Sequence, residues 1–408
     1  MRRVENEPFL QCVRTHVRNQ SIWNWPTRSG VHIISFFFLL LFTILFWNEF
    51  LVYFVKIGLT CAWPKGDDDA LRIFIIADTH LLGHFRGHWL DKIRREWQMY
   101  RSYQSARSIL EPHTAFFLGD LFDEGEWSDE TLLAEYADRF DSLFGGPEGK
   151  VTPTVVLPGN HDLGFHYVMD PHRVRWFNRR YAQEIVDVVS IGKRPFILIT
   201  SMALHGDVCR LCAEAENRLK MIEQSRHCAE TRNISSPCLS ALKSVPWPED
   251  ALSPVLMQHF PLFRSNEVDC LDVSHDDPDR LTEYRPLWDS ISNESTYRLI
   301  DSIRPIVAFN GHSHRPCTKR WNRSGQPHFT EYTVNSFSWR NGPSPTLLLV
   351  SLSTKDSNTE PEVTVCYLPN EHLVIFLYTL TVLIFLIYLF LYLKRLFHLR
   401  YVSEIKSK

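Results

Sequence analysis

Two long apolar segments constrain this 408-residue chain more than any other feature of its sequence. Residues 31–55 read VHIISFFFLLLFTILFWNEFLVYFV, with Glu49 as their one formal charge, and residues 373–393 read LVIFLYTLTVLIFLIYLFLYL, with none. Each segment reaches the roughly 20 residues that a helix needs to cross a bilayer. The first is longer than the apolar region of a signal peptide, and no clear small-residue cleavage site follows it. We therefore expect two transmembrane helices.

Basic residues flank both segments on their outer sides: Arg2, Arg3, Arg14, Arg18 and Arg28 in front, and Lys394, Arg395, Arg400, Lys406 and Lys408 behind. Lysine and arginine near a span are retained in the cytoplasm, so residues 1–30 and 394–408 are predicted to be cytoplasmic tails. The final residues EIKSK form an incomplete dilysine retrieval signal or a generic basic stop-transfer tail, and the two readings have equal weight. Coat or cargo-receptor contacts are expected through this tail.

Between the spans, the sequence predicts one large α/β domain over residues 71–352, joined to the spans by linkers at 56–70 and 353–372. Short apolar runs alternate there with amphipathic stretches such as residues 89–110 and 131–144, which is typical of buried strands and covering helices. A polar, cysteine-rich helical or loop insert is expected at 209–248. The run PTLLLVSL at 345–352 is predicted to be the final strand.

Eight of the nine cysteines lie between the spans, which suits an oxidising compartment: Cys61, Cys209, Cys212, Cys228, Cys238, Cys270, Cys317 and Cys366. Cys209 and Cys212 form a C-x-x-C pair, which is typical of a zinc half-site, a redox pair or a structural disulfide. Because no second pair completes a zinc site, a structural disulfide is favoured. Glycosylation sequons at Asn233, Asn293 and Asn322 agree with the same compartment. The net charge of −3 gives no reason to expect nucleic acid as a partner.

Five apolar runs in this domain end directly in side chains that can bind metal ions. The runs are RIFIIADTH, AFFLGDLFD, TVVLPGNHD, PVLMQHF and PIVAFNGHSH, and they supply Asp78, His80, Asp120, Asp123, Asn160, His161, Asp162, His259, His312 and His314. Ligands gather beyond the carboxyl ends of strands in α/β sheets, so these side chains are expected to converge. Histidine, asparagine and carboxylate without cysteine favour manganese, iron or zinc. Glycines before three of the clusters, Gly119, Gly159 and Gly311, permit sharp turns and close packing.

The order D-x-H, G-D-x-x-D, G-N-H-D, H and G-H-x-H resembles the calcineurin-like metallophosphoesterase superfamily over residues 71–352. The resemblance implies a four-layer αββα sandwich with two metal ions at its rim. One ion would be held by Asp78, His80, Asp120 and His314, and the other by Asp120, Asn160, His259 and His312, with Asp120 bridging. His161 would be the general acid, Asp162 would orient its ring, and Asp123 would either bind metal or orient a neighbouring histidine.

Within the superfamily, GDLFDEG and GNHD depart from the GDxVDRG and GNHE of the protein serine/threonine phosphatases, and Asp123 stands where purple acid phosphatases have tyrosine. The two spans, with LPGNHDLGFH and MQHFPLFR between them, resemble the membrane-bound members of the family that remodel GPI anchors. That resemblance implies manganese, a place in the early secretory pathway (endoplasmic reticulum exit sites, the intermediate compartment and the cis-Golgi), and GPI-anchored proteins as substrates. It implies removal of an ethanolamine-phosphate group from the second mannose of the anchor, which promotes transport from the endoplasmic reticulum to the Golgi.

Two alternatives remain open from the sequence. The first is a lumenal phosphoesterase that acts on another lipid or sugar-phosphate head group. The second is a metal-bound but inactive cargo receptor for GPI-anchored proteins. The candidate general acid His161 argues against inactivity, because a binding protein has no need of a proton donor beside two metal ions.

Overall fold

The computed structural model describes residues 31–65, 69–145, 152–205, 209–233, 235–248, 250–274, 276–322 and 328–407. The predicted tail at 1–30 lies outside this range. The chain forms two compact units: Tyr53–Glu371 is one, and the residues up to Val52 together with His372–Lys408 are the other.

The larger unit is built on two mixed β-sheets. The first has five strands in the order β11-β10-β1-β2-β3, where β1 is Leu71–Ile76, β2 Thr114–Leu118, β3 Thr154–Leu157, β10 Thr346–Leu352 and β11 Glu362–Tyr367. The second has six in the order β4-β5-β6-β7-β9-β8, where β4 is Val186–Ile191, β5 Arg194–Ile199, β6 Val255–Gln258, β7 Val307–Asn310, β8 Cys317–Trp321 and β9 Phe329–Thr333. The strands β1, β2 and β3 are parallel to one another, as are β5, β6, β7 and β9. The carboxyl ends of the parallel strands within each sheet therefore point the same way.

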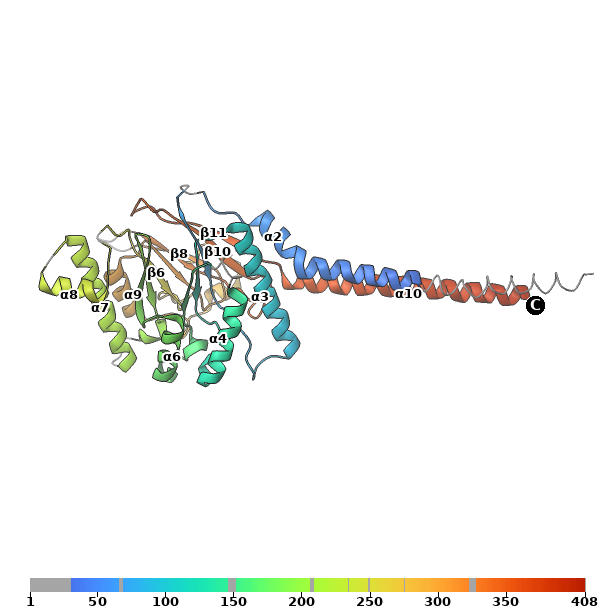
Figure 1. The fold of residues 1–408 in the computed structure, drawn as a ribbon, viewed down its shortest axis with the longest axis horizontal. Coiled ribbons are helices and arrows are strands. Elements are labelled where there is room, and N and C mark those ends of the chain that lie inside the picture. The colour runs from blue at the N-terminus through green and yellow to red at the C-terminus, as the bar shows by residue number, and fades with distance from the viewer. Residues whose placement is uncertain are drawn as a thin grey trace, which may run out of the picture. The chain divides into compact units, whose positions relative to one another are not determined.

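Helices cover the outer faces of the two sheets (Figure 1). They are α3 (Trp89–Leu110), α4 (Glu130–Phe144) and α6 (Pro171–Tyr181), followed by α7 (Arg210–Thr231), α8 (Ser236–Ser244) and α9 (Asn293–Ile303). The predicted αββα sandwich is confirmed, and so are the helices expected at 89–110 and 131–144. The second of these begins one residue earlier than predicted, because the side chain of Asp129 caps it by accepting from the backbone N–H of Leu132.

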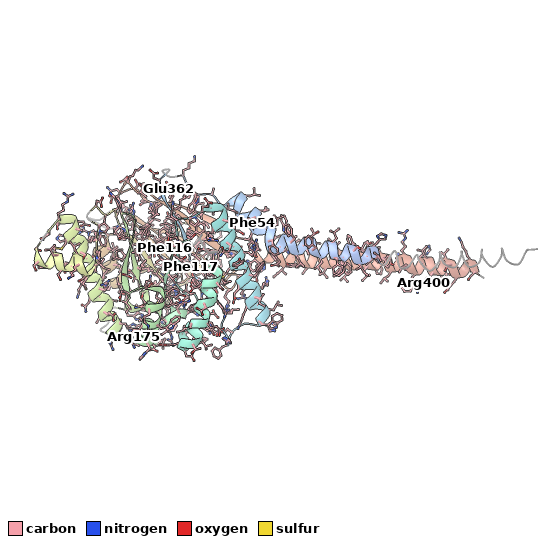
Figure 2. All side chains as sticks on the ribbon, in the orientation of Figure 1. Phe54, Phe116, Phe117, Arg175, Glu362 and Arg400 are labelled. Atoms are coloured by element: carbon pink, nitrogen blue, oxygen red, sulfur yellow. A yellow bond between two sulfur atoms is a disulfide. The ribbon has the colours of Figure 1, made fainter. Side chains whose placement is uncertain are left out.

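The alternation of side chains along β2 shows why the strands bury both faces. Phe116 and Phe117 are neighbours in sequence (labelled in Figure 2), but they belong to different hydrophobic clusters. The ring of Phe116 lies 4.9 Å from that of Phe196 on β5, between the two sheets. The ring of Phe117 packs on the opposite face, against Phe140 and Phe144 of α4. Runs of continuous apolar residues such as TAFFL are the result.

The region predicted as a linker at 353–372 contains a strand. β11 pairs antiparallel with β10, so the predicted final strand at 345–352 is the penultimate one. Val363 and Val365 pack on the core between the sheets, and Cys366 forms a disulfide with Cys61. The prediction was wrong because β11 follows a polar run and lies at the edge of the sheet, where only one side chain of the strand is fully buried.

All eight cysteines between the apolar segments form disulfides: Cys61–Cys366, Cys209–Cys212, Cys228–Cys238 and Cys270–Cys317. The disulfide expected for the C-x-x-C pair is confirmed as an internal one. The insert expected at 209–248 consists of α7 and α8, which Cys228–Cys238 joins.

Two helices are long and apolar enough to cross a membrane, Val31–Thr60 and Glu371–Ser407. Their residues up to Val52 and from His372 onward make up the described part of the smaller unit. They lie antiparallel, since Phe36 contacts Tyr388 while Glu49 accepts a hydrogen bond from the hydroxyl of Tyr378. That bond gives the one charged residue of the first segment a polar partner. Both helices extend beyond the predicted spans, so residues 56–60 and 394–407 are helical as well.

Candidate metal centre

The carboxyl ends of five parallel strands bring the predicted metal-binding residues together. The first group consists of Asp78, His80, Asp120 and His314, whose ligand atoms lie within 4.8 Å of one another. Nε2 of His80 lies 3.1 Å from Nε2 of His314 and 3.5 Å from Oδ2 of Asp120. Nε2 of His314 lies 3.4 Å from Oδ1 of Asp78. This is the set that the family resemblance assigns to one ion.

The second group forms on the other side of Asp120 and consists of Asp120, Asn160, His259 and His312. Nε2 of His259 lies 3.3 Å from Oδ1 of Asp120 and 3.2 Å from Oδ1 of Asn160. Asp120 therefore presents Oδ1 to one group and Oδ2 to the other. A carboxylate placed in this way can bridge two cations.

These distances fit two divalent cations. Adjacent ligands at right angles around an ion with bonds of about 2.1 Å lie about 3 Å apart. Nδ1 of His80 faces the carboxylate of Asp123, so its proton lies there and Nε2 carries a lone pair. That lone pair points toward Nε2 of His314 and the oxygens of Asp78 and Asp120, so a cation between them would meet four ligand atoms.

Three histidine rings are held by a second contact that leaves one nitrogen for the metal. Nδ1 of His80 contacts Asp123 at 3.2 Å, and Nδ1 of His259 donates to the carbonyl of Leu118 at 2.7 Å. Nε2 of His312 donates to the carbonyl of Trp288 at 2.6 Å. Such contacts fix the tautomer and the direction of a ligand. Of the two roles left open for Asp123, the structure supports the orientation of a neighbouring histidine.

The backbone is strained at the same residues. Among the residues that the structure describes, ten other than glycine have positive φ, and five of these are predicted ligands: Asp78, His80, Asp120, His312 and His314, with φ of 57°, 45°, 50°, 71° and 55°. Four of the others follow the last turn of a helix, where this conformation is common. Positive φ is unfavourable for a residue with a Cβ, and it persists at functional sites that the surrounding fold holds in place.

Glycine is required at two positions beside Asp120. Gly119 has φ of +95°, and a Cβ there would lie 2.7 Å from Nδ1 of His259. A Cβ on Gly159 would lie 2.1 Å from Oδ1 of Asp120 and 2.3 Å from its backbone nitrogen. The GNHD turn therefore packs directly against the bridging carboxylate.

Charge in this buried site is governed by Asp120. Burial alone would raise the pKa of Asp120, but His259 and His161 outweigh it and hold the pKa well below the usual range. Burial alone would lower the pKa of His259, but Asp120 outweighs it and raises the pKa to about 9. The carboxylate is thus ionised and ready to bind cations.

Asp162 has a different role from the one predicted. Its carboxylate accepts hydrogen bonds from the backbone N–H groups of Gly159, Leu121 and Phe122 at 2.7, 3.2 and 3.0 Å. The ring of His161 is held instead by the backbone carbonyl of Asp123, 3.1 Å from Nδ1. Asp162 was predicted to orient that ring, but its carboxylate joins the two loops that carry Asp120 and Asn160.

A cavity of about 610 Å³ opens beside the two groups and is lined by Asn160, His161 and His312. Its outer wall comes from aromatic and charged residues: Phe165, Glu267, Asp279, Glu283, Tyr284, Arg285, Trp288, Asp289 and Arg315. Sequence reasoning missed this wall, which comes largely from the loop between β6 and α9. The position of that loop after His259, at the carboxyl end of a strand, is the signal that could have indicated it.

The fold and the site place the chain among known phosphoesterases. Residues 71–316 match the model of the family described as calcineurin-like phosphoesterase. The chain therefore belongs to this family and is a metal-dependent phosphoesterase.

Individual relatives of the chain indicate a narrower group within this family. Metallophosphoesterase 1 homolog of Caenorhabditis elegans is 41% identical over 83% of this chain and 86% of that protein. Metallophosphoesterase 1 of Xenopus laevis is 35% identical over 86% of this chain and 87% of that protein. Among solved structures, a purple acid phosphatase from yellow lupin aligns with a TM-score of 0.38 and 10% identity, over 74% of this chain and 55% of that one.

Replacing Gly159 with alanine is expected to displace Asp120, because the new Cβ cannot fit against its carboxylate. We expect Gly159→Ala to bind fewer metal ions, and to hydrolyse an artificial phosphodiester at least about 100-fold more slowly, a loss typical of a misplacement near 1 Å. Elemental analysis of the purified protein measures the metal. Gly342→Ala is the control, since a Cβ there meets nothing within 4 Å. Normal metal content and rate in Gly159→Ala would contradict the close packing described for this turn.

Replacing Asp162 with alanine is expected to affect the fold as well as the reaction. Three buried N–H groups would lose their acceptor, so the free energy of unfolding should fall by about 3 kcal/mol or more. Chemical denaturation measures this, with Asp138→Ala as an exposed control. A variant of unchanged stability that loses only rate would support the ring-orienting role predicted from the sequence.

Proposed function

We propose that this protein is a phosphodiesterase that removes an ethanolamine-phosphate group from the second mannose of GPI anchors, with manganese as its two metal ions. The resemblance of the whole chain to membrane-bound family members that remodel GPI anchors supports the reaction. Iron and zinc are the alternatives that the same ligands allow.

The cavity beside the metal centre is the observation that carries this proposal. Its lining includes four acidic side chains, Glu267, Asp279, Glu283 and Asp289, and two arginines. Arg285 pairs with Asp289 and Arg315 with Glu267 and Asp279, so the carboxylates still outnumber the arginines. An ammonium group is attracted to carboxylates and to the faces of aromatic rings such as Trp288 and Tyr284. The same flat rings and charged groups can pack against and hydrogen-bond a sugar. A cavity with this lining suits a phosphodiester with an ammonium group on one side and a sugar on the other.

The chemistry divides between the bound ions and the chain's own side chains. Two divalent cations held at this centre would neutralise the phosphoryl oxygens and activate water as the nucleophile. His161 lines the cavity, with Nδ1 held by the carbonyl of Asp123 and Nε2 left for the substrate. Burial alone would lower the pKa of His161, but Asp120 and that carbonyl outweigh it and raise the pKa. A protonated His161 can donate to the leaving oxygen of the mannose.

The proposed location is the early secretory pathway, with the domain in the lumen, both tails in the cytoplasm and both apolar helices in the membrane. Four disulfides support an oxidising compartment. Asn233, Asn293 and Asn322 are exposed, as glycan acceptors must be. GPI-anchored proteins are the proposed substrates, and removal of the side group would promote their transport to the Golgi. The proposed contacts of the C-terminal tail with coat or cargo-receptor proteins belong to the same model.

The decisive experiment is a turnover assay on the purified full chain with Mn²⁺. We expect ethanolamine phosphate to be released from a GPI glycan that carries it on the second mannose. Release should stop with a chelator and in Asp120→Ala, which removes the shared carboxylate and should retain at most one ion. Faster release from glycerophosphoethanolamine than from the glycan would favour the reading as a phosphoesterase for another head group. Glycan binding without turnover would favour a cargo receptor.

Replacing His161 with asparagine tests the general acid. We expect His161→Asn to keep both ions and to lose about 10²–10⁴-fold in rate on the glycan. The loss should be smaller on a nitrophenyl ester, whose leaving group needs no proton. The wild-type rate should fall as the pH rises through the pKa of His161 and the acid is lost, whereas the variant should lack this dependence. Equal losses on both esters would mean that His161 acts mainly by binding phosphate.

A further inference from the structure

The disulfide between Cys209 and Cys212 differs from the other three in what it joins. The other pairs are 305, 47 and 10 residues apart and connect separate segments, whereas Cys209 and Cys212 are three residues apart at the start of α7. In the chain-entropy model the stabilisation from a disulfide grows with the length of the loop that it closes. This disulfide therefore contributes least to stability, and a structural role explains it poorly.

Its two sulfur atoms have unequal surroundings. Cys209 is the N-cap residue of α7, and its Sγ accepts a hydrogen bond from the backbone N–H of Cys212 at 3.0 Å. Cys209 is partly exposed, whereas Cys212 is 1% exposed. The positive end of a helix stabilises a thiolate, so the reduced form of Cys209 is favoured there. Cys209 is therefore the more accessible of the two to a thiol in solution.

His166, from the short helix His166–Val168, faces both sulfurs. Its Nδ1 lies 3.6 Å from Sγ of Cys212 and 4.0 Å from Sγ of Cys209. The same Nδ1 lies 3.3 Å from the carbonyl oxygen of Met202, which can only accept, so Nδ1 carries a proton. The ring stacks on that of His205, with centroids 3.9 Å apart and planes 9° from parallel. The ring of His166, which these contacts fix in place, can therefore act as a proton donor beside Sγ of Cys212.

We propose that Cys209–Cys212 is a thiol–disulfide exchange site that reacts with external dithiols and is separate from the metal centre. The attacking thiolate forms a bond to Sγ of Cys209, the bond between Cys209 and Cys212 breaks, and Cys212 leaves with the electron pair. His166 in its imidazolium form gives its Nδ1 proton to that leaving thiolate, and the ring regains a proton from solvent. The second thiol of the dithiol then attacks its own sulfur in the mixed disulfide and releases Cys209. The pair gains two electrons and two protons, and the external dithiol becomes a disulfide.

The test compares two disulfides of one helix in the wild-type full chain. Cys228–Cys238 begins near the other end of α7 and is the internal control. The purified protein is treated with dithiothreitol for increasing times, alkylated and digested, and each pair is quantified by mass spectrometry. We expect Cys209–Cys212 to open at least about tenfold faster than the control pair. Equal rates would overturn the proposal, and this comparison needs no variant that could fail to fold.

Two variants test the assigned roles. In Cys212→Ser, incubation with oxidised glutathione should leave a stable mixed disulfide on Cys209, and its absence would overturn the proposal. His166→Gln should slow the opening by dithiothreitol about tenfold, because the leaving thiolate loses its proton donor. His172→Gln, on the exposed side of the neighbouring α6, is the matched control and should not change the rate.

Zinc is the competing ligand for His166, Cys209 and Cys212. Tight zinc binding by the reduced pair that prevents exchange would also overturn the proposal.

Discussion

The carboxylate of Asp120 is the interaction on which the rest of the site depends. Its Oδ2 faces His80 from the first sheet, and its Oδ1 faces His259 from the second while also accepting from the backbone N–H of His161 at 2.8 Å. Two sheets and three loops therefore meet at one side chain. Such a meeting requires the sheets to pack face to face, so the inter-sheet core formed by residues such as Phe116 and Phe196 is also what sets the geometry of the metal centre.

The fold stabilises a local structure that would be unfavourable by itself. Five ligand-bearing residues have positive φ, each at a cost of roughly 1–3 kcal/mol. Asp162 offsets part of that cost by accepting from three backbone N–H groups on the two loops around Asp120. Burial raises the pKa of Asp162 to about 7, and the nearby charge of Asp120 adds to the effect, since the two carboxylates repel each other. Divalent cations would relieve the repulsion between the carboxylates, so the centre suits bound positive charge that the chain's own side chains do not provide.

Reaction and recognition are carried by different parts of the chain. The residues that fit the metal ions follow strands of the two sheets, whereas the cavity wall comes largely from the loop between β6 and α9. Trp288 links the two parts, because its carbonyl holds the ring of His312 while its side chain lines the cavity. Under the proposed function, a change in this loop away from Trp288 would alter the substrate without altering the chemistry, as is common when binding residues lie on loops over a rigid scaffold.

The sequence by itself determined the α/β class, the two apolar helices and the residues that gather at the metal centre, whereas the αββα layering followed from the resemblance of its motifs to a known family. It could do so because strands and spans have a fixed periodicity and length, and because the carboxyl ends of parallel strands must meet. Only the tertiary structure decided which residues form hydrogen bonds and disulfides with one another. It paired Asp162 with backbone groups, Asp123 with His80, and the eight cysteines between the apolar segments with one another, and it added β11 to the sheet and a wall to the cavity. Such choices depend on loops that are far apart in sequence and on ring orientations, and no local pattern of residues encodes where those loops come into contact.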